Sequence, residues 1–199
     1  MKRSRLWRLG WILAVAWLLA GCASTYLLDN EVTSFSSLTA VPSQPTYRFE
    51  RLPSQQAPGQ AQLETLADAA LHKAGLRRDD ANPRYTVQVS GRVQRILSPW
   101  YSPWDGWGWG PGFGHFGHRG FHHGFFGPFP RMEPPWYQRE VSIIMRELPS
   151  NRVVYETRAA NTGPWTDGGA VFPAMFEAAL QGFPTPPPGP RIVNIQVGR

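Results

Sequence analysis

A stretch rich in glycine, aromatic residues and histidine, from Ser98 to Pro135, sets the strongest limit on how this chain can fold. Because glycine recurs there so often, the stretch favours neither a helix nor a regular strand. It joins two segments that both have strand periodicity. We therefore expect a long loop or an extended hairpin tip at the edge of the domain, with the core built from the residues on either side.

The flanking residues show helix and strand periodicities in turn. Helical spacing covers 60–74, where Gly75 has the position of a C-cap glycine, and returns over 172–183, where Pro173 suits the first turn. Strand patterns cover 31–38, 46–52, 85–94, 137–148, 152–160 and 191–197. These elements predict a two-layer α+β domain with a mostly antiparallel sheet of about five to six strands and two amphipathic helices.

The amino-terminal residues are typical of an export signal. Residues 1–8 carry four positive charges and no acid, and an apolar run follows from Leu9 to Leu19. That run is well short of the ~20 residues that a membrane-spanning helix needs, so a cleaved signal is the better interpretation. The sequence around Cys22, Leu-Ala-Gly-Cys, resembles the lipobox that precedes a lipid-modified cysteine.

These features divide the chain into a cleaved lipoprotein signal (1–21), a tether that is lipidated at Cys22 (22–30) and one domain (31–197). Cys22 is the only cysteine, so the fold has no internal disulfide. Ala23 follows it, which favours the outer membrane over the inner membrane, with the protein on the periplasmic face. Several acyl chains are needed for stable anchoring.

The charge of the mature chain argues against nucleic-acid binding. The signal holds four of the 20 basic residues and none of the 14 acidic residues, which leaves a formal charge of only +2. Neither the composition nor the expected compartment suits a nucleic-acid partner. The expected partners are the membrane, through the lipid, and an envelope protein or glycan.

Several short sequence segments together resemble those of one family of bacterial lipoproteins. These are TYRFERLP from residue 46, the helix end LHKAGL from residue 71, PRYTVQV from residue 83 and AALQGFP from residue 178. With the lipobox, they resemble the domain of unknown function 4136 over roughly residues 26–197. The resemblance implies a small envelope lipoprotein with an α+β domain, sometimes with an aromatic, glycine-rich insert, and it implies no particular activity.

The insert itself admits three interpretations. A low-complexity loop can be passive, with its aromatic side chains partly folded back onto the domain. Large, rigid aromatic side chains also dominate binding hot spots and membrane interfaces, which predicts a docking element. The candidate docking residues are Trp100, Tyr101, Trp104, Trp107 and Trp109.

The third interpretation is a metal site in the same insert. Four imidazoles could bind zinc, copper or nickel, and they belong to His115, His118, His122 and His123. No helix fixes their spacing and no cysteine completes the set, so this remains the alternative function. We expect no cofactor beyond the covalent lipid.

Known catalytic signatures are missing from the sequence. It has no G-x-S-x-G elbow, H-E-x-x-H motif, P-loop or dinucleotide fingerprint. The acids Glu64, Asp68, Asp79 and Asp80 lie on or beside the first predicted helix, and a solvated face is the expected role for them. We therefore expect a non-enzymatic envelope lipoprotein that binds a partner or supports envelope integrity.

Overall fold

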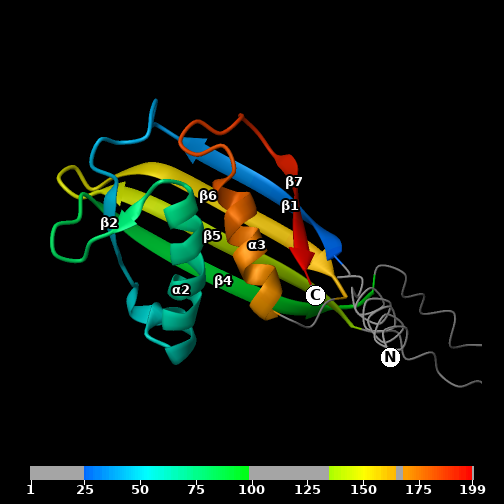
Figure 1. Ribbon diagram of the computed structural model, residues 1–199. Coiled ribbons are helices and arrows are strands. Elements are labelled where there is room, and N and C mark those ends of the chain that lie inside the picture. Colours follow the sequence, from blue (N-terminus) through cyan, green and yellow to red (C-terminus); the bar gives the residue numbers. More distant parts are fainter. Residues whose placement is uncertain (1–24, 99–134, 165–167, 199) are drawn as a thin grey trace, which may run out of the picture.

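The computed structural model describes residues 25–98, 135–164 and 168–198 (Figure 1), and these contain seven strands, two α-helices and one 3-10 turn. In chain order the elements are β1 (Thr25–Ser36), β2 (Thr46–Phe49), η1 (Pro53–Gln55), α2 (Pro58–Lys73), β3 (Arg77–Arg78), β4 (Tyr85–Ile96), β5 (Trp136–Glu147), β6 (Arg152–Gly163), α3 (Gly168–Leu180) and β7 (Arg191–Gly198).

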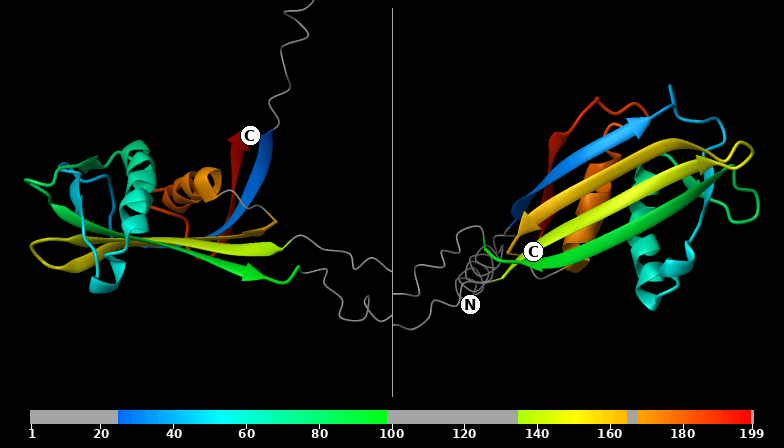
Figure 2. Two further views of the ribbon diagram at one scale, coloured as in Figure 1. Left: turned by 90° about the horizontal axis from the view of Figure 1, so that it is seen from below. Right: turned by 180° about the vertical axis from the view of Figure 1, so that it is seen from behind.

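All seven strands form one sheet in the order β3-β2-β4-β5-β6-β1-β7. The four pairs from β4 to β7 are antiparallel, whereas β2 is parallel to both β3 and β4. Both helices cover the same face of the sheet and leave the other face open (Figure 2). The predicted α+β class with two helices is confirmed. The predicted strand number is one too low, because the two-residue strand β3 is too short to have a periodicity.

Helix α2 forms where the sequence predicts it. Proline occupies its first position, where the lost backbone N–H has no partner in the helix, and Gly75 follows its C-cap with φ +92°. The apolar stripe places Ala67, Ala70 and Leu71 against the sheet. His72 lies on the exposed side of the last turn, as expected for a side chain near the negative end of the helix dipole.

Helix α3 begins earlier than its sequence pattern suggests. It starts at Gly168 and ends at Leu180, so Pro173 lies inside the helix and the prediction of a first-turn proline is wrong. The pattern misses the start because Gly168, Gly169 and Ala170 contribute no large apolar side chain to the stripe. The helix is followed by Gly182, with φ +87°, which is the position expected for its stop.

The core lies between the helices and the inner face of the sheet. Alternation along each strand places one side chain in two against the helices. The fully buried members on the sheet include Leu28, Val32, Val87, Val89, Val141, Ile143, Met145, Tyr155 and Ala159, and those on α3 include Val171, Met175, Phe176 and Ala179. Within the described ranges, no helix has the length and hydropathy needed to cross a bilayer.

The tether predicted for 22–30 is wrong from Thr25 onward. Strand β1 begins at Thr25, and its first eight residues pair with β7, from Thr25 opposite Gly198 to Val32 opposite Arg191. Leu28 and Asn30 are fully buried on the inner face. These residues belong to the sheet because the last strand of the chain supplies their hydrogen-bond partners, which no local pattern indicates.

Candidate functional site

The residues that the sequence nominated lie outside the described residues. These are the lipidation residue Cys22, the aromatic residues Trp100, Tyr101, Trp104, Trp107 and Trp109, and the histidines His115, His118, His122 and His123. The structure does place Ser98 and Pro135, which flank the insert, and Thr25, the first described residue after Cys22. Their arrangement defines the candidate site.

Thr25, Ser98 and Pro135 all lie at one end of the sheet. Ile96 pairs with Trp136, so the two sides of the insert are neighbours, and Tyr137 pairs with Gly163. Since β1 is antiparallel to β6 with Glu31 opposite Ala160, the start of β1 lies at the same end of the sheet as Gly163. Figure 1 shows the starts of β1 and β5 and the ends of β4, β6 and β7 together at this end.

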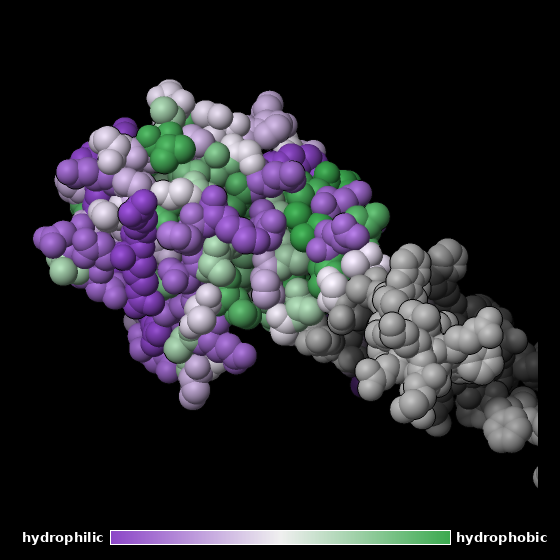
Figure 3. Space-filling model, in the orientation of Figure 1, coloured by the Kyte–Doolittle hydropathy of each residue, from purple (hydrophilic) through white to green (hydrophobic). Residues whose placement is uncertain are grey.

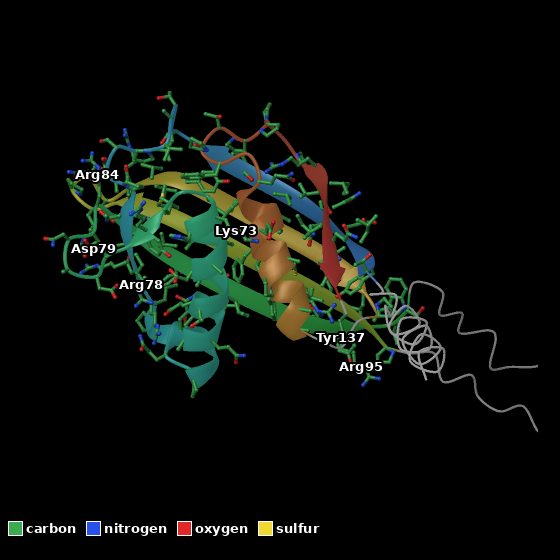
Figure 4. The ribbon with its side chains drawn as sticks, viewed as in Figure 1. Lys73, Arg78, Asp79, Arg84, Arg95 and Tyr137 are labelled. Atoms are coloured by element: carbon green, nitrogen blue, oxygen red, sulfur yellow. The ribbon has the colours of Figure 1, made fainter. Side chains whose placement is uncertain are left out.

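We call this end the base of the sheet and define it by the residues 25–28, 95–98, 135–137, 163–164 and 195–198. The opposite end, the tip, carries the turn 148–151 and the loop 79–84. Figure 4 shows Arg95 and Tyr137 at the base, and Arg78, Asp79 and Arg84 at the tip. A strand of twelve residues at about 3.3 Å per residue separates the two ends by roughly 40 Å.

The surface of the base is apolar and basic. Leu27 is 64% exposed and Leu97 is 71% exposed, which makes them two of the most exposed large hydrophobic side chains in the described residues. Trp136 and Tyr137 are half-buried, and Arg95 is exposed. None of the residues that define the base is an aspartate or a glutamate. Figure 3 shows that the tip is mainly hydrophilic, whereas hydrophobic surface is more frequent toward the other half.

A row of buried polar side chains lies directly behind the base, on the inner face of the sheet. Arg139 is only 2% exposed and pairs across the strands with Asn161, which follows Ala160, the partner of Glu31 on β1. Desolvation lowers the pKa of Arg139 from its ordinary value. Its guanidinium lies 5.3 Å from the centroid of the Tyr137 ring, and Nη1 donates to the Tyr137 carbonyl at 3.5 Å. Arg139 therefore supports an aromatic residue of the base from within.

In the two asparagines of this row, the side-chain nitrogen atoms are hydrogen-bonded and the side-chain oxygen atoms are not. Nδ2 of Asn30 donates to the carbonyls of Leu28 and Val193, at 3.0 and 3.2 Å, and Nδ2 of Asn161 donates to the carbonyl of Asp29 at 2.8 Å. The Oδ1 atoms of both asparagines are buried and have no hydrogen-bond partner in the described part of the chain. Strand alternation places Arg139 on the same face as Val141 and Ile143, so the sequence contained the signal for its burial.

The acids beside the first helix are structural, and the expectation that all of them are solvated is wrong. Glu64 is 5% exposed and accepts two hydrogen bonds from Arg51, at 2.6 and 2.7 Å. The hydrogen bonds from Arg51 lower the pKa of Glu64. Asp68 accepts a hydrogen bond from the hydroxyl of Tyr47, whose pKa is raised by its burial and by that carboxylate.

The remaining two acids organise the loop that follows β3. Asp79 accepts the backbone N–H groups of Ala81 and Asn82, at 3.0 and 2.9 Å, and Asp80 pairs with Arg78 at 3.0 Å. Each of the four acids thus has a local partner that explains its position. Within the described residues, no group of three or more His, Cys, Asp or Glu side chains is arranged to hold a metal ion.

The open face of the sheet carries a shallow hollow of about 440 Å³. Its lining comes from β1, β5 and β6 and consists of Glu31, Thr33, Phe35, Gln138, Glu156, Arg158 and Ala160. Arg158 is already ion-paired with Glu140, and Ser90 and Ser142 are hydrogen-bonded across the neighbouring strands at 2.7 Å. Alternating charges and paired hydroxyls are typical of a solvated sheet face, so the base remains the better candidate.

Comparison with known proteins gives a family match and distant structural similarities. The profile of the domain of unknown function DUF4136 matches residues 31–185, as the sequence phrases suggested. The comparison with curated proteins gives no match.

Three solved structures are similar in part. The PelC dodecamer from Paraburkholderia phytofirmans is 11% identical, with 79% of this chain and 99% of that chain covered and a TM-score of 0.48. A point variant of it is 13% identical, with 76% and 94% covered and a TM-score of 0.46. A PDZ domain protein from Parabacteroides distasonis ATCC 8503 is 16% identical, with 94% and 42% covered and a TM-score of 0.47. Similarities this distant carry no argument about function.

Proposed function

We propose, from the premise that this chain belongs to the DUF4136 family, that it is a non-enzymatic lipoprotein of the bacterial envelope. Lipid on Cys22 holds it on the periplasmic face of the outer membrane, and the aromatic insert docks an envelope protein or glycan. The observation that supports this proposal best is the shared position of Thr25, Ser98 and Pro135 at the base of the sheet. An insert that leaves the sheet at this end starts at the same end as the residues that follow the lipid site, with β5 and β6 between them.

The composition of the insert suits such a role. Its tryptophan and tyrosine side chains combine a large apolar surface with one polar atom, and such side chains supply much of the energy at binding interfaces. A set of exposed aromatic residues is a liability in water unless a partner covers them. The residues proposed to make the contact are Trp100, Tyr101, Trp104, Trp107 and Trp109.

The register of the sheet allows a clean deletion of the insert. Because Ile96 and Trp136 are directly paired, residues 97–135 can be replaced with a two-residue Asn-Gly turn that closes β4 and β5 as a hairpin without a change of register. A second variant keeps the length and changes only the five aromatic residues to serine. Both variants are compared with the parent protein after crosslinking in intact cells and quantitative mass spectrometry.

We expect both variants to lose the same partners, which would identify the aromatic side chains as the docking element. If neither variant loses any partner, the insert is passive and this part of the proposal fails. The anchor is tested separately with Cys22→Ser, which should move the protein from the membrane fraction to the soluble periplasmic fraction. Retention of that variant in the membrane would refute the lipid anchor.

A further inference from the structure

We propose that the base of the sheet rests on the lipid surface, with Leu27 and Leu97 entering the headgroup region and Arg95 facing lipid phosphates. This inference rests on the proposed lipid anchor at Cys22 and adds to it a defined contact surface and an orientation of the domain. It concerns only described residues, and the aromatic insert is not needed for it.

The length of the tether brings the base to the membrane. Thr25, the first residue of β1, is three residues after Cys22. Three residues span at most about 11 Å when fully extended. A longer tether would let the domain tumble away from the bilayer, but this one keeps the base within reach of the headgroups whatever its conformation.

The side chains at the base match that environment. Leu27 projects from the open face of the sheet at the start of β1, and Leu97 follows the end of β4. Both are more than 60% exposed, and exposed leucines that a lipid surface can cover are stabilised by about 25 cal/mol for each Å² of apolar surface removed from water. Half-buried Trp136 and Tyr137 are residue types that favour the boundary between lipid and water.

The charge at the base favours contact with anionic lipid headgroups. Arg95 is exposed there, and its strand neighbour Tyr137 shares the same face of the sheet. Because the residues of the base include no aspartate or glutamate, nothing there repels lipid phosphates. The two carboxylates of β1 belong to Asp29 and Glu31, which lie two and four residues farther from the base than Leu27.

This contact also fixes the direction of the domain. The strands run away from the bilayer, so the turn 148–151 at the tip lies roughly 40 Å into the periplasm. The two carboxylates and the one guanidinium group of the loop 79–84 lie at this distant end (Figure 4).

The test uses the fact that Cys22 is the only cysteine. In the lipidated protein its sulfur is a thioether, so a cysteine introduced elsewhere is the only thiol that a maleimide fluorophore can label. We would prepare the full lipoprotein as Leu27→Cys and Leu97→Cys. Ile192→Cys is the matched control, because Ile192 is 65% exposed, as Leu27 is at 64%, and lies on the neighbouring strand.

The control differs from Leu27 mainly in its distance from the base. Leu27 pairs with Gln196, four residues farther along β7 than Ile192, which corresponds to about 13 Å. Each labelled protein is reconstituted in vesicles of phosphatidylethanolamine and phosphatidylglycerol. Fluorescence is then measured with a headgroup-level spin-labelled lipid as one quencher and aqueous iodide as the other.

We expect the labels at Leu27 and Leu97 to be quenched by the lipid probe and protected from iodide, and the label at Ile192 to show the reverse. Labels at the base that iodide reaches as easily as Ile192 would overturn the inference. Labels protected from both quenchers would also overturn it, because protein rather than lipid would then cover the base.

Two controls separate this inference from the proposed function. The mass of the amino-terminal peptide reports acylation of Cys22, and co-flotation with the vesicles reports anchoring. If the protein is acylated and floats but its base labels match Ile192, only the contact surface is wrong. If Cys22 carries no lipid and the protein does not float, the proposed anchor fails and the inference fails with it.

Discussion

The ion pair between Arg51 and Glu64 gives the sharpest prediction about stability. Glu64 lies on the buried stripe of α2, where its side chain is 7% exposed, and it joins the helix to the segment that follows β2. Its carboxylate accepts two charge-assisted hydrogen bonds from Arg51 and a longer one, at 3.4 Å, from Gln60. The perturbation is Glu64→Gln, which keeps the shape of the side chain and removes its charge.

The magnitude follows from these contacts. A hydrogen bond to a charged group contributes roughly 1.5–3 kcal/mol. Arg51 is partly exposed and regains water when its partner changes, and the glutamine oxygen can still accept one bond, so only part of two such bonds is lost. We expect Glu64→Gln to lower the free energy of unfolding by about 2 kcal/mol near pH 6.

The pH dependence has a definite sign. Because the folded state lowers the pKa of Glu64 below its ordinary value of 4.5, the folded protein binds this proton less readily than the unfolded chain. The stabilising contribution is therefore fully present above that ordinary value and is lost as the pH falls through the lower pKa of the folded state. The difference between the parent protein and Glu64→Gln should shrink as the pH is taken from 6 to 3.

The assay is a urea titration of the full-length protein in detergent, followed by far-ultraviolet circular dichroism at several pH values. Glu177→Gln is the matched control, since Glu177 forms an ion pair with Lys73 in which both side chains are exposed. We expect a change below about 1 kcal/mol for this control. A Glu64 variant as stable as the control at pH 6, or a difference that is the same at pH 6 and pH 3, would refute the reasoning.

Three further predictions follow from other parts of the chain. Phe176→Ala should cost about 3–5 kcal/mol in urea titration, because the ring is fully buried in the core. Gly182→Ala should cost about 1–2 kcal/mol in the same assay, since its φ is +87° and a Cβ would lie 3.3 Å from Cα of Pro186; no loss would contradict the backbone argument. If the insert holds metal, calorimetric zinc binding by the full chain should disappear on alanine substitution of His115, His118, His122 and His123, and equal binding by both proteins would exclude these histidines as ligands.

Local periodicity predicted the elements whose partners are close in sequence. The hairpin of β5 and β6 and the helix α2 were predicted to within a few residues, because alternation and helical spacing each report one buried face. The start of β1 was not predicted, because Thr25 pairs with Gly198 at the other end of the chain. The sequence of such a strand shows only a short alternation, because its partner on that side lies far away in the chain.

The buried charges show a second limit of sequence reasoning. Glu64 lies three residues before Ala67 and seven before Leu71, so it shares their stripe on α2, but its charge suggested a solvated position. Burial is possible because Arg51, thirteen residues earlier in an irregular segment, supplies the partner. The same limit applies to Arg139. The alternation along β5 predicted that its side chain is on the inner face, but only the tertiary structure shows which groups surround it.

The topology of the sheet decides whether an insert leaves the domain at the base or at the tip. Strand β4 runs toward the base and β5 runs away from it, so their connection must lie at the base, whereas the connection of β5 to β6 must lie at the tip. A passive insertion would be tolerated at either end, because both are turns between antiparallel strands at the surface. The chain has a four-residue turn at the tip, 148–151, and carries its long aromatic segment at the base, where β1 begins three residues after Cys22. With the proposed lipid on Cys22, an insertion at the base rather than at the tip favours a partner at the membrane surface over one roughly 40 Å away from it.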